Sequence, residues 1–201
     1  MALTQLGCTT HLMASAGRLG NAEDEVRLAL AANPLSVGLT AELGCCAYYA
    51  RQFERAVRGY NQALAIKADD IVALWGLGKS YTQLGRYQEA LDVLHRAPQP
   101  QGMYPTVILG EIGYAYARRG DRAAAHAALS ELRAMGERIF VDPYFRAQIH
   151  HALGETDAAL AALEEAYDKR STILVAIRSD PKWDGLHQNP RFRDLLSRIG
   201  G

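Results

Sequence analysis

Apolar and small residues between positions 71 and 97 recur every three or four residues in two successive runs. The members of the two runs are Leu74, Leu77, Gly78 and Tyr81, followed by Tyr87, Ala90, Leu91, Leu94 and Ala97. This spacing places each run on one face of an amphipathic helix. Gly85 lies between the runs and permits the left-handed backbone that ends a helix. The pattern therefore predicts two antiparallel helices joined by a turn at Gly85.

The same pattern recurs along the chain with a period close to 34 residues. The small residue of the second helix is Ala22, Ala56, Ala90, Ala125 and Ala159. The small residue of the first helix is Thr10, Gly44, Gly78, Gly113 and Ala147, and the turn position is Gly17, Arg51, Gly85, Gly120 and Gly154. A fixed period of this length is typical of stacked helical units. We predict about five hairpins, at residues 3–36, 37–70, 71–104, 105–138 and 140–170.

Prolines mark where the helices break and restart. Pro98, Pro100 and Pro105 lie close together between the third and fourth copies, where they break a helix and accommodate a one-residue slip in the period. Asp142 and Pro143 read as a helix N-cap followed by proline at the first helical position. A new helix is expected to begin there.

The tail at 171–201 follows a different pattern from the repeats. Asp180–Pro181 and Asn189–Pro190 each resemble an N-cap with proline after it. One apolar stripe at helical spacing consists of Phe192, Leu195, Leu196 and Ile199. We predict that the tail is a C-terminal cap over the last repeat, and that residues 1–201 form a single solenoid.

The first copy is the least typical, because its first helix contains Thr9, Thr10, His11 and Ser15. Two explanations remain open. An end repeat keeps one face in water and becomes polar. Alternatively, the chain begins partway through a longer protein whose upstream repeats cover this face.

The chain resembles tetratricopeptide repeat proteins in the residues that fill their signature positions. In the third copy these are Leu77, Gly78, Tyr81, Ala90, Leu94 and Ala97. The resemblance covers nearly the whole chain and implies an all-α, right-handed superhelical solenoid. Arg51 departs from it at the turn position of the second copy, and Arg122 and Thr156 replace an aromatic residue in the last two copies.

The C-terminal third has a narrower resemblance. Residues 113–125, 141–170 and 174–200 look like the end of bacterial multidomain proteins in which a tetratricopeptide array follows a DNA-binding, nucleotide cyclase or kinase domain. This resemblance implies a bacterial regulatory or scaffolding module.

Charge balance and the length of the apolar runs limit the classes of partner that this chain can bind. Lys plus Arg equals Asp plus Glu at 22 each, and a neutral chain lacks the basic surface that direct nucleic-acid binding requires. No apolar run approaches the roughly 20 residues that span a bilayer. We therefore expect a cytoplasmic protein without a membrane or nucleic-acid partner.

No pattern of catalytic or metal-binding residues emerges. Cys8, Cys45 and Cys46 are too few and too badly spaced for disulfides or a zinc site. His150 and His151 are neighbours that diverge by about 100° on a helix, which disfavours a shared metal. A nucleophile with a base, a carboxylate pair and a phosphate loop are all missing. We expect neither an enzyme nor a cofactor.

The resemblance also implies a binding surface, because tetratricopeptide proteins build their concave wall from set positions of the first helices. In this sequence these are Cys45, Tyr48, Tyr49, Trp75, Lys79, Thr82, Gln83, Tyr114, Arg118, Tyr144, Gln148 and His151. Aromatic residues with a few donors suit an extended or helical peptide. The alternative is that Trp75 and the tyrosines fill a tightly wound interior.

Two functions are consistent with these observations. The first is a non-enzymatic scaffold or adaptor that binds a protein or peptide in its groove. The second is a sensory or assembly domain of a transcriptional regulator or signalling enzyme, separated from its N-terminal effector. Self-association through the N-terminal face is a further expectation.

Overall fold

The computed structural model describes residues 19–98 and 104–200, and within them all regular structure is helical. The α-helices are α2 (Leu19–Ala32), α3 (Val37–Tyr49), α4 (Phe53–Ile66), α5 (Ile71–Gln83), α6 (Tyr87–His95), α7 (Tyr104–Arg119), α8 (Arg122–Met135), α9 (Pro143–Ala152), α10 (Thr156–Asp168) and α11 (Pro190–Ile199). Two 3-10 helices, η1 (Thr172–Ala176) and η2 (Pro181–Leu186), lie between α10 and α11. The first helix predicted for the first copy, with Thr10 and Gly17, lies outside the described residues.

The predicted helix starts are confirmed by side-chain caps. Asp142 accepts a hydrogen bond from the Tyr144 amide at the start of α9, and Asn189 caps α11 in the same way. Asp180 caps the segment that begins at Pro181, which is a 3-10 helix and not an α-helix. Such caps satisfy amides that have no partner inside the helix.

The turns within the hairpins adopt the left-handed backbone that the repeat pattern predicts. Gly85, Gly120 and Gly154 have φ angles of 75°, 89° and 78°. Arg51 has a φ of 59° at the corresponding position despite its side chain. A non-glycine residue is sterically strained in this conformation, so the contacts of the Arg51 side chain bear on why arginine occupies this turn.

Small residues let the helices of a hairpin approach closely. A Cβ atom on Gly78 would lie 2.6 Å from the Leu94 side chain, which is closer than packing allows. Gly78 and Leu94 are both in the tetratricopeptide signature. The signature at these positions therefore reflects helix contact.

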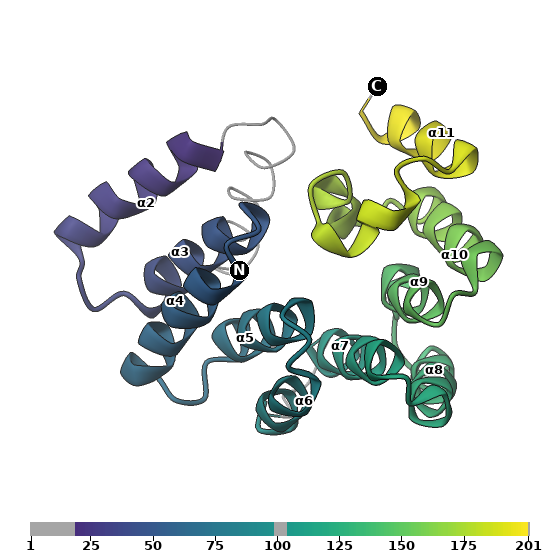
Figure 1. Ribbon diagram of the computed structural model, residues 1–201, viewed down its shortest axis with the longest axis horizontal. Helices are drawn as coiled ribbons and strands as arrows, with labels where there is room; N and C mark the ends of the chain where they lie inside the picture. Colours follow the sequence, from purple (N-terminus) through teal and green to yellow (C-terminus); the bar gives the residue numbers. More distant parts are fainter. Residues whose placement is uncertain (1–18, 99–103, 201) are drawn as a thin grey trace.

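The hairpins stack into a curved array (Figure 1). The helices α3, α5, α7 and α9 pack successively against one another and form the inner wall, while their partners α4, α6, α8 and α10 lie outside. None of the described helices is long and apolar enough to cross a membrane. The predicted all-helical repeat solenoid is confirmed.

The tail divides into two parts with different positions. α11 packs on α10, with Phe192 and Leu195 buried, as a lid over the last hairpin would. Residues 171–189 instead turn back into the concave side of the array (Figure 1). This second part crosses the surface that the sequence assigns to partner binding.

Candidate functional site

The residues predicted for the concave wall lie on the first helices, and their exposure differs. Tyr48, Tyr49, Lys79, Thr82, Tyr114, Tyr144 and Gln148 are buried. Cys45, Trp75, Gln83 and His151 are half-buried, and Arg118 is exposed. Most of the buried members are close to the tail segment 180–184. That segment therefore occupies the middle of the predicted groove.

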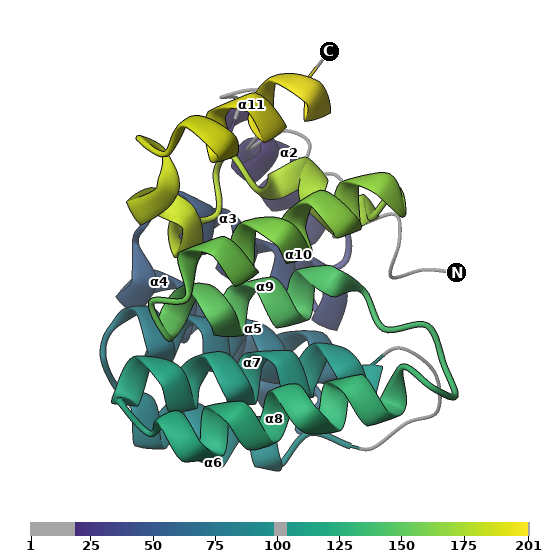
Figure 2. The same ribbon diagram turned by 90° about the vertical axis from the view of Figure 1, so that its right-hand side faces the viewer.

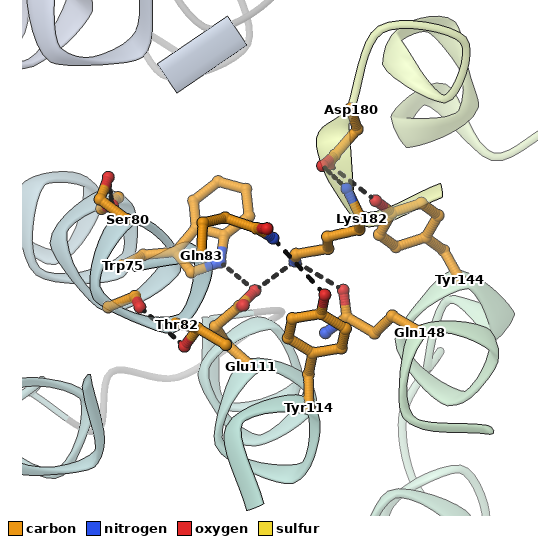
Figure 3. Close-up of polar contacts among 12 residues, drawn as sticks. Trp75, Ser80, Thr82, Gln83, Glu111, Tyr114, Tyr144, Gln148, Asp180 and Lys182 are labelled. Carbon is orange, nitrogen blue, oxygen red and sulfur yellow. Dashed lines mark hydrogen bonds and ion pairs between the residues drawn. The ribbon is translucent and has the colours of Figure 1, made fainter. Parts of the chain in front are cut away.

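Asp180 joins the second and fifth hairpins. Its Oδ1 accepts a hydrogen bond from the Tyr48 hydroxyl at 3.1 Å. Its Oδ2 accepts one from the Tyr144 hydroxyl at 3.1 Å (Figure 3). Tyr48 comes from α3 and Tyr144 from α9. One carboxylate thus connects opposite ends of the inner wall.

Lys182 forms a buried ion pair two residues further on. Its Nζ lies 2.6 Å from Oε2 of Glu111 on α7, and both side chains are 1% exposed. The same Nζ donates to Oε1 of Gln148 at 2.9 Å, and Trp75 Nε1 donates to Glu111 Oε2 at 3.3 Å (Figure 3). The pair therefore lies inside a hydrogen-bonded set contributed by α5, α7 and α9.

Lys79 places a second buried cation in this interior. Its Nζ lies 4.2 Å from the centre of the Tyr48 ring and 4.7 Å from that of Trp75. Aromatic faces attract a cation that has lost its water. Burial lowers the pKa of Lys79, while Asp180 acts in the opposite direction.

The pKa of Asp180 reflects the same balance. Burial raises it, but the positive charges of Lys79 and Lys182 and its hydrogen bonds outweigh burial, and the net pKa lies below the ordinary value. Burial raises the pKa values of Tyr48 and Tyr144 well above their ordinary value, so both remain hydroxyl donors. Lys79 and Lys182 balance the charges of Glu111 and Asp180.

Trp183 is the apolar anchor of the tail segment and is fully buried. Its ring meets Tyr144 edge-on at 5.5 Å and stacks on His151 at 5.3 Å and on Phe192 at 6.3 Å. Its Nε1 donates to the Tyr144 hydroxyl at 3.2 Å. Trp183 therefore anchors the tail segment against α9 and α11.

Arg51 contacts the end of this segment. Its Nη2 lies 2.7 Å from Oδ1 of Asp184, and its Nη1 donates to the carbonyl of Tyr49. A glycine could not make either contact. These contacts account for an arginine at a turn whose backbone suits glycine.

Three of the predicted residues remain accessible on one rim of the concave side. Gln83, Arg118 and His151 lie at the C-terminal ends of α5, α7 and α9. Arg118 donates to the Tyr114 hydroxyl at 2.9 Å, and Gln83 does so at 3.5 Å. Arg118 forms no ion pair with a carboxylate in the described part of the chain. We call Gln83, Arg118 and His151 the donor rim.

The sequence pattern does not reveal the polar residues of the tail and their partner. It indicates Asp180 only as a helix cap, and it gives no role to Lys182 or Glu111. The sequence does contain a signal for Glu111, because this residue is the single charge among the otherwise uncharged residues 104–117. A carboxylate at such a position needs a buried cation.

A curved stack of helical hairpins with a 34-residue period and left-handed turns defines a tetratricopeptide repeat solenoid. Family models described as tetratricopeptide repeat match residues 47–107 and 144–165. The crystal structure of a tetratricopeptide repeat protein from Parabacteroides merdae superposes with a TM-score of 0.53, covering 98% of this chain and 78% of that one at 18% identity. Tetratricopeptide repeats are thus present, and the fold agrees with them.

One curated protein of longer length is similar in sequence. Superkiller protein 3 of Schizosaccharomyces pombe is 29% identical over 141 residues, which cover 66% of this chain and 10% of that protein. The chain spans about a tenth of the length of this relative.

Proposed function

We propose that the chain is a non-enzymatic interaction scaffold that holds a peptide or a partner domain on its concave side, at the donor rim. Tetratricopeptide repeats generally mediate contacts between proteins. The middle of the concave side is filled by residues 180–184, whereas Gln83, Arg118 and His151 are open to solvent at least in part. A partner would therefore contact the rim and the tail segment together.

The tail segment is best regarded as a permanent part of the wall. Its buried apolar side chains include Leu174, Ile177, Trp183 and Leu186. Exposing each of them costs about 1.5–3 kcal/mol, and a whole domain is stable by only about 5–15 kcal/mol. A peptide that displaced the segment would have to offset most of the stability of the fold.

The main support for the proposal is that Arg118 is exposed and forms no ion pair among the described residues. Its guanidinium is exposed, has no carboxylate partner among the described residues, and is positioned by Tyr114. The neighbouring Gln83 amide and His151 imidazole add further hydrogen-bonding groups. Such a row suits the backbone carbonyls or carboxylates of an extended peptide.

A peptide selection tests this assignment. Peptides displayed on phage are selected on the purified full chain, and their affinities are then measured for wild type, Arg118→Ala and Arg119→Ala. Arg119 is the matched control, because it is the next residue of the same helix and already contacts Gln88 and Asp121. We expect Arg118→Ala to weaken binding about tenfold, with little change for Arg119→Ala. Equal affinities for the two variants, or no enriched peptide, would count against the donor rim.

A further inference from the structure

The connection between α8 and α9 exposes two large apolar side chains. Within residues 136–142, Phe140 is 64% exposed and Ile139 is 41% exposed. The connections at 33–36 and 67–70 are shorter by three residues. Figure 2 shows the α8–α9 connection projecting beyond the ends of the helices that it joins. This connection is long enough to form a surface of its own.

A hollow of about 320 Å³ lies beside these side chains. Leu132 and Val141 contribute apolar lining, next to Ile139 and Phe140. The volume lies near the lower end of the range for ligand pockets, about 300–1,000 Å³. It is enough to accept a bulky side chain, and it is too small for a folded element.

The hollow is lined by more cations than anions. Arg133, Arg146 and Lys169 line it, together with a single acidic residue, Glu137. Arg146 and Lys169 both pair with Glu165, at 2.6 and 2.8 Å. Arg133 forms no ion pair in the described part of the chain. The positive charge here is only partly compensated, although the chain as a whole is neutral.

We propose that this α8–α9 hollow binds an acidic peptide that carries one bulky apolar side chain. The apolar side chain enters the hollow beside Ile139 and Phe140, and a flanking carboxylate pairs with Arg133. A charged rim around an apolar centre is the usual anatomy of a peptide or protein contact. The hollow is separate from the donor rim, so the proposal does not rest on the groove.

The test measures fluorescence anisotropy of a labelled synthetic peptide in which a single phenylalanine is flanked by glutamates. The full chain is compared with Arg133→Glu and Ile139→Ser. Matched controls are Arg58→Glu, another exposed arginine without an ion pair among the described residues, and Ile66→Ser, which is also 41% exposed. Circular dichroism verifies that each variant folds, as expected for exposed positions.

We expect Arg133→Glu and Ile139→Ser to weaken binding by about tenfold or more, and the two controls to stay within about twofold of wild type. Added salt should weaken binding of the glutamate peptide. Equal losses for Arg133→Glu and Arg58→Glu would overturn the proposal, and so would the absence of saturable binding. Sedimentation with phosphatidylserine vesicles but no binding of the peptide would identify a membrane surface and refute a peptide site.

Discussion

Replacing Lys182 by methionine tests whether the tail is held in the concave interior by a buried ion pair. Methionine keeps most of the length and apolar stem of lysine but removes its charge. Glu111 would then retain only the hydrogen bond from Trp75, at 3.3 Å, and its Oε1 already has no hydrogen bond. Gln148 would lose its contact with Lys182 as well.

The expected loss of unfolding free energy follows from the burial of both Lys182 and Glu111. With side chains 1% exposed, neither Glu111 nor Lys182 can be stabilised by water after the other is removed. Removing one partner of such a pair costs about 3–5 kcal/mol, whereas replacing both by apolar residues is often neutral. We therefore expect Lys182→Met to lose about 3–5 kcal/mol of unfolding free energy. The double variant Lys182→Met with Glu111→Leu should regain much of that loss.

The assay is urea denaturation followed by circular dichroism, with Asp184→Asn as the control. Asp184 belongs to the same segment and pairs with Arg51, but both side chains are nearly half exposed. An exposed pair contributes about 0–1 kcal/mol. If Lys182→Met cost no more than Asp184→Asn, the Lys182–Glu111 pair would not be buried in solution. If the double variant were as unstable as the single one, an unpaired carboxylate would not be the cause.

Four further outcomes are expected. Trp183→Ala should cost about 3–5 kcal/mol in the same assay, and a cost below about 1 kcal/mol would mean that the segment is not packed. Arg170 has a φ of 56°, which strains a residue with a side chain, and it forms no ion pair in the described chain. Arg170→Gly should therefore raise the free energy of unfolding by up to about 1 kcal/mol, and a decrease would show that the backbone at this turn is not strained. The pKa of Asp180 in the folded protein lies below the ordinary value of 3.8, so the ionised carboxylate stabilises the fold above that pH. This stabilisation is lost as the pH falls through the folded pKa, and Asp180→Asn should therefore reduce the loss of stability measured in acid. Burial lowers the pKa of His151 below 6.5, so stability should fall as the pH drops below about 6.5, and His151→Gln should remove this slope.

The repeat pattern predicted the helices of the array well. Positions such as Gly78 and Leu94 depend on contacts between helices that are near neighbours along the chain, and those contacts leave a regular spacing. The turn at Gly85 is likewise visible because its backbone angle excludes most other residues. Arg51 is an exception to this rule. The side-chain contact that explains an arginine at this turn, with Asp184, is visible only in the structure.

The concave site could be predicted only in part. The expected residues do face inward, but burial separates Tyr48 and Tyr144 from the accessible Gln83 and Arg118. The path of residues 171–189 determines which of these residues are buried and which are accessible. The repeat period and residue spacing do not predict that path. Its polar contacts join positions as far apart as Tyr48 and Asp180. A pattern within one sequence does not record such a pairing.

The sequence by itself determined that this protein is a stack of helical hairpins, which helix faces are apolar, and where the described hairpins turn. Local physical chemistry sets these features through helical periodicity, capping and turn geometry. The tertiary structure alone decided that the tail fills the groove, that Lys182 is buried against Glu111, and which side chains remain open to a partner. These features depend on distant segments meeting, and burial, which determines the energy of each charge, exists only after they have met.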